Sequence, residues 1–297
     1  MATVFLAEDL RHGRHVAIKV LRPGVAEMVG AERFLREIRT IALLQHPHIL
    51  GLIDSGDVEG TAWYVMPFVD GESLRARLER ERQLSLGSAL QIARGVASAL
   101  EHAHRHGVLH RDIKPENILL QGDEAQLADF GISSVIGATR SERLTETGLI
   151  PGTPTYMSPE QAAGERNPDG RSDIYALGCV IYEMLVGEPP HTGPTAQAIM
   201  AKRQYQTPAP IHLARVNVPT SVEQAVMKAL ARVPADRFAT AAEFAAALSA
   251  TAEAAPSREG PTVAISGPKR RWAPAAIAGL LLWRRRSSWL GVLPLPR

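Results

Sequence analysis

The hydrophobic period of the chain changes near Ser73, and this change limits the fold more than any other feature. Before it, short apolar runs bounded by turn residues indicate β-strands. After it, apolar residues recur at positions i, i+3 and i+4, which indicates amphipathic helices. The sequence therefore predicts an α+β fold with two lobes, a small β-rich lobe over residues 1–69 and a larger helical lobe over residues 70–250.

Strands and one helix are predicted in the first lobe. Apolar runs at 4–7 and 16–20 flank a polar turn that contains Gly13, which predicts a β-hairpin. A helix over 30–46 must end before Pro47, because proline disfavours helical geometry in the residue that precedes it. The segments HILGLIDSGD and TAWYVMPFVD predict two further strands, with a turn between them at Gly56, Asp57 and Gly60.

The second lobe is predicted to be mainly helical, with short strands in a loop-rich stretch that extends to about residue 170. Helices are predicted at 73–81, 85–107, 172–187, 196–204, 221–231 and 240–254, and strands at 108–110, 118–121 and 125–129. Cys179 is the single cysteine, so it cannot form an internal disulfide. Because it lies in an apolar helical run, we expect it to be a buried, apolar-type side chain.

Charge is distributed unevenly along the chain. From residue 251 onward eight Lys and Arg stand against two Asp and Glu, whereas residues 1–250 carry 25 against 29. A mildly acidic body gives no electrostatic reason to expect nucleic-acid binding. Residues 251–271, rich in Pro, Gly, Ser and Ala, are predicted to be a linker.

The last segment, residues 272–297, is a short apolar and basic tail. Its apolar run WAPAAIAGLLLW has 12 residues, whereas a membrane-spanning helix needs about 20. A shortened membrane anchor, an interfacial segment and a degenerate tail all fit this pattern. No signal peptide precedes Val4, so we expect a cytoplasmic protein, with membrane association through this tail left open.

The densest polar cluster is HRDIKPENILL at 110–120, followed by LADFGIS at 127–133. Asp112, Asn117 and Asp129 offer hard oxygen ligands. With Lys114 beside them, this set suits Mg²⁺ bound together with an anionic phosphate substrate. One Asp near one Lys is more often a simple salt bridge, but the whole string is far more specific. The histidines at 102, 104 and 106 are interpreted as solvated or packing residues and not as metal ligands.

With these motifs, residues 1 to about 250 resemble a protein kinase. The resemblance is carried by VAIK (16–19), HRDIKPEN (110–117), DFG (129–131), GTPTYMSPE (152–160) and SDIYALG (172–178). The variants are those of serine/threonine kinases, and SPEQA is most like the bacterial eukaryotic-type branch. The resemblance implies a bilobal kinase-like fold, ATP and Mg²⁺ as cofactors, and protein substrates phosphorylated on Ser or Thr.

The resemblance also implies catalytic roles. Asp112 would accept the proton of the substrate hydroxyl, and Lys114 would steady the γ-phosphate. Asn117 and Asp129 would hold Mg²⁺. In ATP binding, Lys19 would contact the α- and β-phosphates and pair with Glu37. The remaining nucleotide contacts would come from Val4, Ala17, Met66 and, through its N–H, Val69.

Regulation is implied by Arg111, beside the catalytic aspartate, which would pair with a phosphate on the activation loop. By the same resemblance, Thr145 and Thr147 match the autophosphorylated pair, in a scheme that allows a dimer reacting in trans. Thr153 matches the threonine that bridges the catalytic aspartate and lysine. A structural pair between Glu160 and Arg237 would brace the larger lobe.

The opening of the chain departs from the family pattern. By the resemblance, Val4 matches the valine that ends the family's Gly-rich loop, which implies a chain without the family's first strand and loop glycines. We expect weaker ATP affinity and a less stable small lobe from a chain of this form. A start codon further upstream and a true truncation both explain it. The alternative function is a non-catalytic pseudokinase or binding module. The intact residues Lys19, Asp112, Asn117 and Asp129 argue against it.

Overall fold

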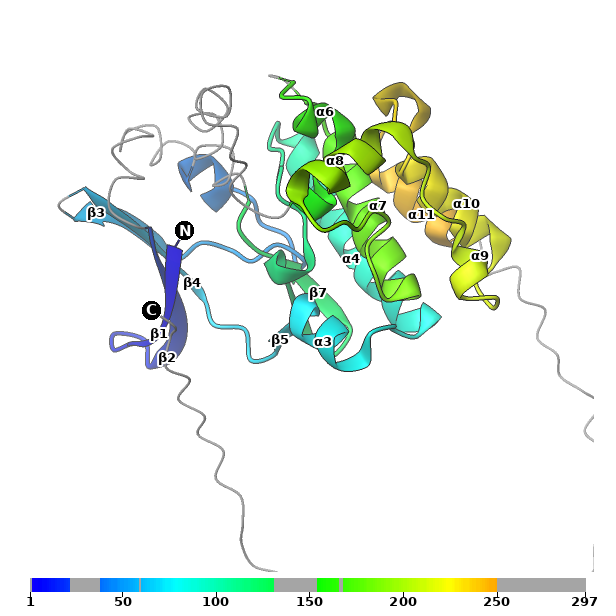
Figure 1. The fold of residues 1–297 in the computed structure, drawn as a ribbon. Helices are drawn as coiled ribbons and strands as arrows, with labels where there is room; N and C mark the ends of the chain where they lie inside the picture. The colour runs from blue at the N-terminus through cyan, green and yellow to red at the C-terminus, as the bar shows by residue number, and fades with distance from the viewer. Residues whose placement is uncertain (1, 22–37, 59, 131–153, 166–167, 250–297) are drawn as a thin grey trace, which may run out of the picture. The chain divides into compact units, whose positions relative to one another are not determined.

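A computed structural model describes residues 2–21, 38–58, 60–130, 154–165 and 168–249. The chain divides into two compact units, Met1–Pro256 and Ser257–Arg297. All the described residues belong to the first unit, in which a β-sheet precedes a helical region (Figure 1). Within the described ranges, no helix has the length and apolar character to cross a bilayer.

The N-terminal sheet has four antiparallel strands in the order β1-β2-β4-β3. Their bounds are Ala2–Asp9 for β1, Arg14–Leu21 for β2, Asp54–Val58 for β3 and Thr61–Pro67 for β4. The predicted hairpin is confirmed as β1–β2. Its turn is closed by Gly13, which has φ +59° and donates its N–H to the Asp9 carbonyl over 2.7 Å.

The predicted strand over HILGLIDSGD was placed too early. The Leu127 carbonyl accepts from the Leu50 N–H, and the Leu127 N–H donates to the His48 carbonyl, at 3.0 and 2.8 Å. The first residues of this segment are therefore bonded to the second sheet, and β3 begins only at Asp54.

Gly56 and Asp57 lie inside β3, although the sequence suggested a turn there. Gly56 pairs with Trp63 across the sheet, and a Cβ at Gly56 would lie 2.6 Å from the indole. The glycine thus leaves room for an aromatic ring that crosses the strand. Gly60, with φ +76°, directly precedes β4, and its N–H donates to the Asp57 carboxylate.

The helix predicted over 30–46 is described only in its last part, since residues 22–37 lie outside the described ranges. Residues 38–42 are helical, and the helix ends before Pro47 as predicted. Ile38 and Ile41 are buried there.

A second, three-stranded sheet has the order β5-β6-β7. Its strands are Glu72–Ser73 for β5, Ile118–Gln121 for β6 and Glu124–Leu127 for β7. This confirms the strands predicted near 118–121 and 125–129. The strand predicted at 108–110 is wrong, because the His110 N–H donates to the Asp173 side chain and not to a neighbouring strand.

The helical region follows the predicted periodicity closely. Its longer helices are α3 (Leu74–Glu81), α4 (Leu86–Arg105), α7 (Arg171–Val186), α8 (Ala196–Tyr205), α10 (Thr220–Ala229) and α11 (Ala241–Ser249). Short elements are α6 (Pro159–Ala162), α9 (Ile211–Ala214), and the 3₁₀ turns η1 (Pro115–Asn117), η2 (Pro154–Tyr156) and η3 (Pro234–Asp236).

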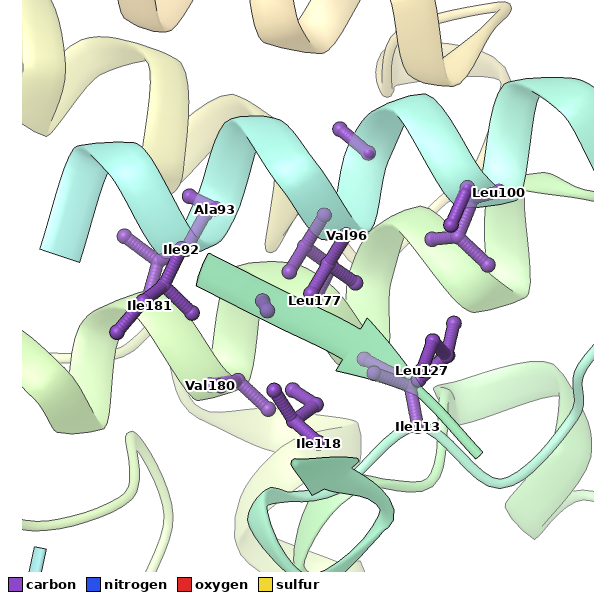
Figure 2. Close-up of a cluster of buried hydrophobic side chains, with 14 of the residues drawn as sticks. Ile92, Ala93, Val96, Leu100, Ile113, Ile118, Leu127, Leu177, Val180 and Ile181 are labelled. Carbon is purple, nitrogen blue, oxygen red and sulfur yellow. The ribbon is translucent and has the colours of Figure 1, made fainter. Parts of the chain in front are cut away.

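The core of this region lies where α4 packs against α7, α11 and β7. Figure 2 shows buried side chains of α4, α7 and the strands β6 and β7 gathered together, among them Ile92, Val96, Leu100, Ile118, Leu127, Leu177 and Ile181. Burial of each such side chain contributes about 1.5–3 kcal/mol. The strand β6 directly follows the HRDIKPEN segment (110–117), and β7 ends just before Asp129. The core that holds these two strands therefore also fixes one end of each polar segment. Cys179 is fully buried in it, as predicted.

Candidate active site

Asp173, on the buried α7, anchors the start of the HRDIKPEN loop. Its carboxylate accepts the backbone N–H groups of His110 and Arg111 at 2.9 and 2.7 Å, and it contacts His104 Nε2 at 2.8 Å. Burial opposes ionisation of this carboxyl, but the hydrogen bond with His104 and the further polar contacts hold the pKa of Asp173 below its usual range. The loop turns sharply here, with φ +66° at Arg111.

Asp112, Lys114 and Asn117 form one polar group within this loop. Lys114 Nζ lies 2.6 Å from Asp112 Oδ2, and the Asn117 amide donates to the Asp112 carbonyl at 2.8 Å and to Oδ2 at 3.2 Å. The Asp112 and Lys114 side chains are 35% and 34% exposed, so both are accessible from solvent. An ionised carboxylate held beside an ammonium can accept a proton while the ammonium neutralises a nearby phosphate.

The DFG segment is attached directly to this loop. The Ala128 N–H donates to the Asn117 carbonyl at 2.8 Å, and His110 Nε2 contacts the Ala128 carbonyl at the same distance. The His110 ring also meets Phe130 edge to face, with centroids 4.7 Å apart. Asp129, between these anchored neighbours, has φ +65°.

Asp129 binds two groups on the N-terminal sheet. Lys19 Nζ lies 2.5 Å from Oδ2, and the Tyr64 hydroxyl donates to Oδ1 at 2.6 Å. Although burial opposes its charge, the Lys19 ammonium and these two hydrogen bonds hold the pKa of Asp129 below the ordinary value. The pKa of Tyr64 is raised, first by burial and then by the Asp129 charge.

The strand register places Val4, Ala17 and Met66, three of the residues predicted to contact the nucleotide, on the same sheet face as Lys19. Lys19 is opposite both Val4 and Tyr64, and Ala17 is opposite Met66. Opposite residues, and residues two apart on a strand, share one face of a sheet. Val4 is 52% exposed, whereas Met66 is buried. Val69, just after β4, is half-buried.

Several predicted residues cannot be placed. Glu37, Thr145, Thr147 and Thr153 lie outside the described residues, so the Lys19–Glu37 pair stays a prediction. Within the described ranges, Lys19 forms an ion pair with Asp129, and the Arg111 guanidinium has no hydrogen-bond or ion-pair partner. The Glu160–Arg237 pair is present, with two contacts of 2.7 Å.

Three residues of the site were not assigned roles from the sequence. His110 and Asp173 hold the loop, and Tyr64 orients Asp129. A signal existed for Asp173, because an aspartate inside the apolar run of α7 demands buried partners. Tyr64 gave no comparable signal, since an aromatic residue in a strand is usually explained by packing.

The donor set fits Mg²⁺. The part of the chain that the structure describes has no group of three or more His, Cys, Asp or Glu side chains that could hold a metal ion. Mg²⁺ that is bound together with a nucleotide needs fewer protein ligands, because phosphate oxygens and water molecules complete its octahedral coordination. The Asn117 amide oxygen and the Asp129 carboxylate are hard donors of this kind. The rings of His102 and His106 pack 4.5 Å apart, whereas His104 Nε2 is hydrogen-bonded to the buried Asp173 carboxylate, a contact that the sequence did not predict.

Comparison with known proteins agrees with this geometry. The family model described as "Protein kinase domain" matches residues 1–247. The serine/threonine-protein kinase PknB of Mycolicibacterium smegmatis is 39% identical over 254 residues, which cover 84% of this chain and 40% of that protein. PknD of Mycobacterium tuberculosis is 40% identical over 250 residues, which cover 83% of this chain and 37% of that protein. The chain therefore spans about two fifths of the length of these curated relatives.

Among solved structures, one described as Rad53 1–466 in complex with AMP-PNP matches with a TM-score of 0.68. The match covers 82% of this chain and 60% of that chain at 24% sequence identity. At this identity the likeness establishes the fold.

Proposed function

Because this chain belongs to the protein kinase family, we propose that it transfers the γ-phosphate of ATP to serine or threonine hydroxyls of proteins. The observation that carries the proposal is one hydrogen bond, from the Ala128 N–H to the Asn117 carbonyl. It joins the Asp112–Lys114 group to the segment in which Asp129 pairs with Lys19. A proton acceptor and a phosphate-binding lysine are thereby tied to one framework.

The nucleotide end of the site rests on the N-terminal sheet. Val4, Ala17 and Met66 supply apolar surface for the adenine on the face that also carries Lys19. The Val69 N–H is the proposed donor to the base. Lys19 binds the α- and β-phosphates. Mg²⁺, held by Asn117 and Asp129, would shield the charge that develops on the transferred phosphoryl group.

At the substrate end, Asp112 accepts the proton of the attacking hydroxyl. The hydroxyl oxygen forms the new bond to the γ-phosphorus as the bond to the ADP oxygen breaks. The Lys114 ammonium lies against the Asp112 carboxylate and therefore beside the attacking hydroxyl. From there it balances the charge on the phosphoryl oxygens. The arrangement performs its chemistry by positioning and charge neutralisation.

The finer features of the function belong to the same proposal. Phosphorylation of Thr145 or Thr147 would supply an anion for Arg111, whose exposed guanidinium has no partner among the described residues. Reaction in trans within a dimer and the role of Thr153 stay predictions. So do the cytoplasmic location and any membrane contact of residues 272–297.

The test is phosphorylation of casein and of the chain itself by the full-length protein with Mg-ATP, read by intact mass and phosphosite mapping. Asp112→Asn should lower the rate roughly 10²- to 10⁴-fold with an unchanged melting temperature. Asp54→Asn, on the exposed start of β3, is the matched control and should react normally. A folded wild-type chain that binds ATP but transfers no phosphate would support the non-catalytic binding module instead.

A further inference from the structure

Arg75, on α3, contacts three segments that are distant from it in sequence. Its Nε donates to Glu116 Oε1 at 3.0 Å, and its Nη1 donates to Glu183 Oε1 at 2.8 Å. Its Nη2 donates to the Tyr156 hydroxyl. The three acceptors belong to η1, α7 and η2, so one guanidinium joins four elements of the helical region.

The Arg75 guanidinium balances the charge of a buried carboxylate, that of Glu183. The Glu183 side chain is only 5% exposed, and its other oxygen accepts the Tyr156 hydroxyl at 2.5 Å. Burial opposes the charge on Arg75, but the hydrogen bond to Glu183 and the nearby carboxylates raise the pKa of the guanidinium. The guanidinium carries five N–H donors on three nitrogens in one plane, so it can reach three separate acceptors at once, whereas a lysine ammonium has its three donors on a single nitrogen.

The position of Glu116 connects this network to the catalytic loop. Glu116 lies in η1, directly between Lys114 and Asn117, and the Asn117 N–H donates back to the Lys114 carbonyl at 3.0 Å. Asp173 holds the start of the same loop through His110 and Arg111. The loop is therefore fixed at both ends, by a carboxylate of α7 at one end and by Arg75 at the other.

The network also reaches the segment that follows residue 153. Tyr156 of η2 is bound to Arg75 and Glu183, and a few residues later the Gln161 amide donates to the Arg111 carbonyl at 3.1 Å. The loop and the η2–α6 segment are thus linked twice, once through Arg75 and once through Gln161.

We propose that Arg75 is a positioning residue for phosphoryl transfer, holding the Glu116 end of the catalytic loop so that Asp112 and Lys114 meet the substrate correctly. The inference rests on the proposed function, but its structural part does not require activity to be tested. The competing explanation is an ion pair that stabilises the fold and nothing more. Small displacements of catalytic groups are costly, since about 1 Å can lower a rate about 100-fold.

Arg77 provides the matched control. It lies on the same helix, with a side chain 15% exposed against 25% for Arg75. It pairs with Asp123 at 2.6 Å and donates to the Gly122 carbonyl, which places its contacts at the β6–β7 turn and away from the catalytic loop. Loss of either arginine removes a partly buried ion pair from α3, and only Arg75 contacts η1.

The experiment compares the full chain with four variants, Arg75→Met, Arg75→Lys, Arg75→Met/Glu183→Gln and Arg77→Met. We measure melting temperature, kcat, KM for ATP, and hydrogen exchange at the amides of Asn117 and Ile118, which bond within the η1 turn. Arg75→Met should lower kcat by about 10-fold or more, leave KM for ATP within about two-fold, and speed exchange at both amides. Arg75→Lys should fall between it and wild type.

The double variant separates positioning from stability. Replacing Glu183 by Gln removes the buried charge that Arg75→Met leaves uncompensated, so the melting temperature should recover. Kcat and exchange should not recover, because Glu116 still lacks its partner. Arg77→Met should lower the melting temperature without changing kcat or exchange at these amides.

Two results would overturn the inference: recovery of kcat together with the melting temperature in the double variant, or an equal loss of kcat in Arg77→Met. If the wild-type chain transfers no phosphate, the proposed function fails. Hydrogen exchange then tests the positioning role without any measurement of activity. The role is supported only when the Arg75 variants, and not Arg77→Met, lose protection at Asn117 and Ile118.

Discussion

Lys19 and Asp129 are separated by 110 residues in the chain, yet Lys19 Nζ lies 2.5 Å from Asp129 Oδ2. The pair connects β2 of the N-terminal sheet with the segment that follows β7. Tyr64 lies opposite Lys19 on β4, and its hydroxyl donates to the other carboxylate oxygen of Asp129. Asp129 is therefore held ionised and oriented by two strands, which suits the Mg²⁺-binding role proposed for it beside Lys19.

Lys19→Met should lower the rate of phosphoryl transfer at least roughly 100-fold, because the phosphates would lose their cation and Asp129 would lose the ammonium that balances its charge. Initial rates with Mg-ATP measure the effect. Lys202→Met, on α8, is the control, since the hydrogen bond that Lys202 makes among the described residues is to the Thr192 carbonyl, away from the Asp112 and Asp129 loops. Activity of Lys19→Met within about two-fold of wild type would contradict the assigned role.

Glu160→Ala should destabilise the protein by about 3–5 kcal/mol, because it leaves the Arg237 guanidinium buried without its carboxylate. Both Arg237 contacts to this carboxylate are 2.7 Å long, and the Arg237 side chain is fully buried. Urea unfolding measures the change in the free energy of unfolding. Glu165→Ala, an exposed change on the same segment, should cost less than about 0.5 kcal/mol. An equal loss of unfolding free energy in the two variants would show that the Glu160–Arg237 ion pair does not stabilise the fold in this way.

The free energy of unfolding should fall as the pH is lowered from 7 to 5, in part through His191. Burial, followed by the positive charges of Arg203 and Lys202, lowers the pKa of His191 to about 4 from 6.5. The unfolded chain therefore binds a proton that the folded protein rejects. The contribution of His191 is present above about pH 6.5 and is lost as the pH falls toward about 4.

Between pH 7 and 5 this difference amounts to about 2 kcal/mol. Urea unfolding of wild type and of His191→Gln at both pH values measures it. The pH dependence of the variant should be smaller by that amount. Parallel pH profiles for the two proteins would show that His191 does not titrate in this way.

Cys179 should resist alkylation in the folded protein. Its side chain is fully buried in α7, and burial raises the pKa of the thiol to about 12, so almost no thiolate exists at pH 8. Iodoacetamide at pH 8 should label the chain within minutes in 6 M guanidinium chloride and negligibly in buffer. Mass spectrometry gives the readout. Rapid labelling of the native protein would contradict the burial.

Much of the helical region could be predicted because its periodicity is local. The helices α4 and α7 lie within a residue or two of their predicted ends, and Gly107, with φ +73°, follows α4 where the sequence placed its end. The Glu160–Arg237 pair was predicted from the resemblance and is present. These features depend on residue type at fixed spacing, which a single sequence displays.

The misplaced strands have a different cause. Residues 48–50 and 108–110 have strand-like composition, but the backbone groups of His48 and Leu50 bond to Leu127, and the His110 N–H donates to the Asp173 side chain. Partners that are distant in sequence decide where a backbone hydrogen bond goes. No local pattern near His48 or His110 contains that information.

The sequence by itself determined the α+β class, most of the helices, and the identity of the polar residues Lys19, Asp112, Lys114, Asn117 and Asp129. The tertiary structure alone decided which of them meet, since Lys19 approaches Asp129 through sheet register, and Asp112 is linked to Asp129 through Asn117 and Ala128. It also revealed Arg75, whose three acceptors lie 41, 81 and 108 residues away along the chain. Propensity acts over a few residues, whereas ion pairs and loop anchors form between whatever the folded core brings together.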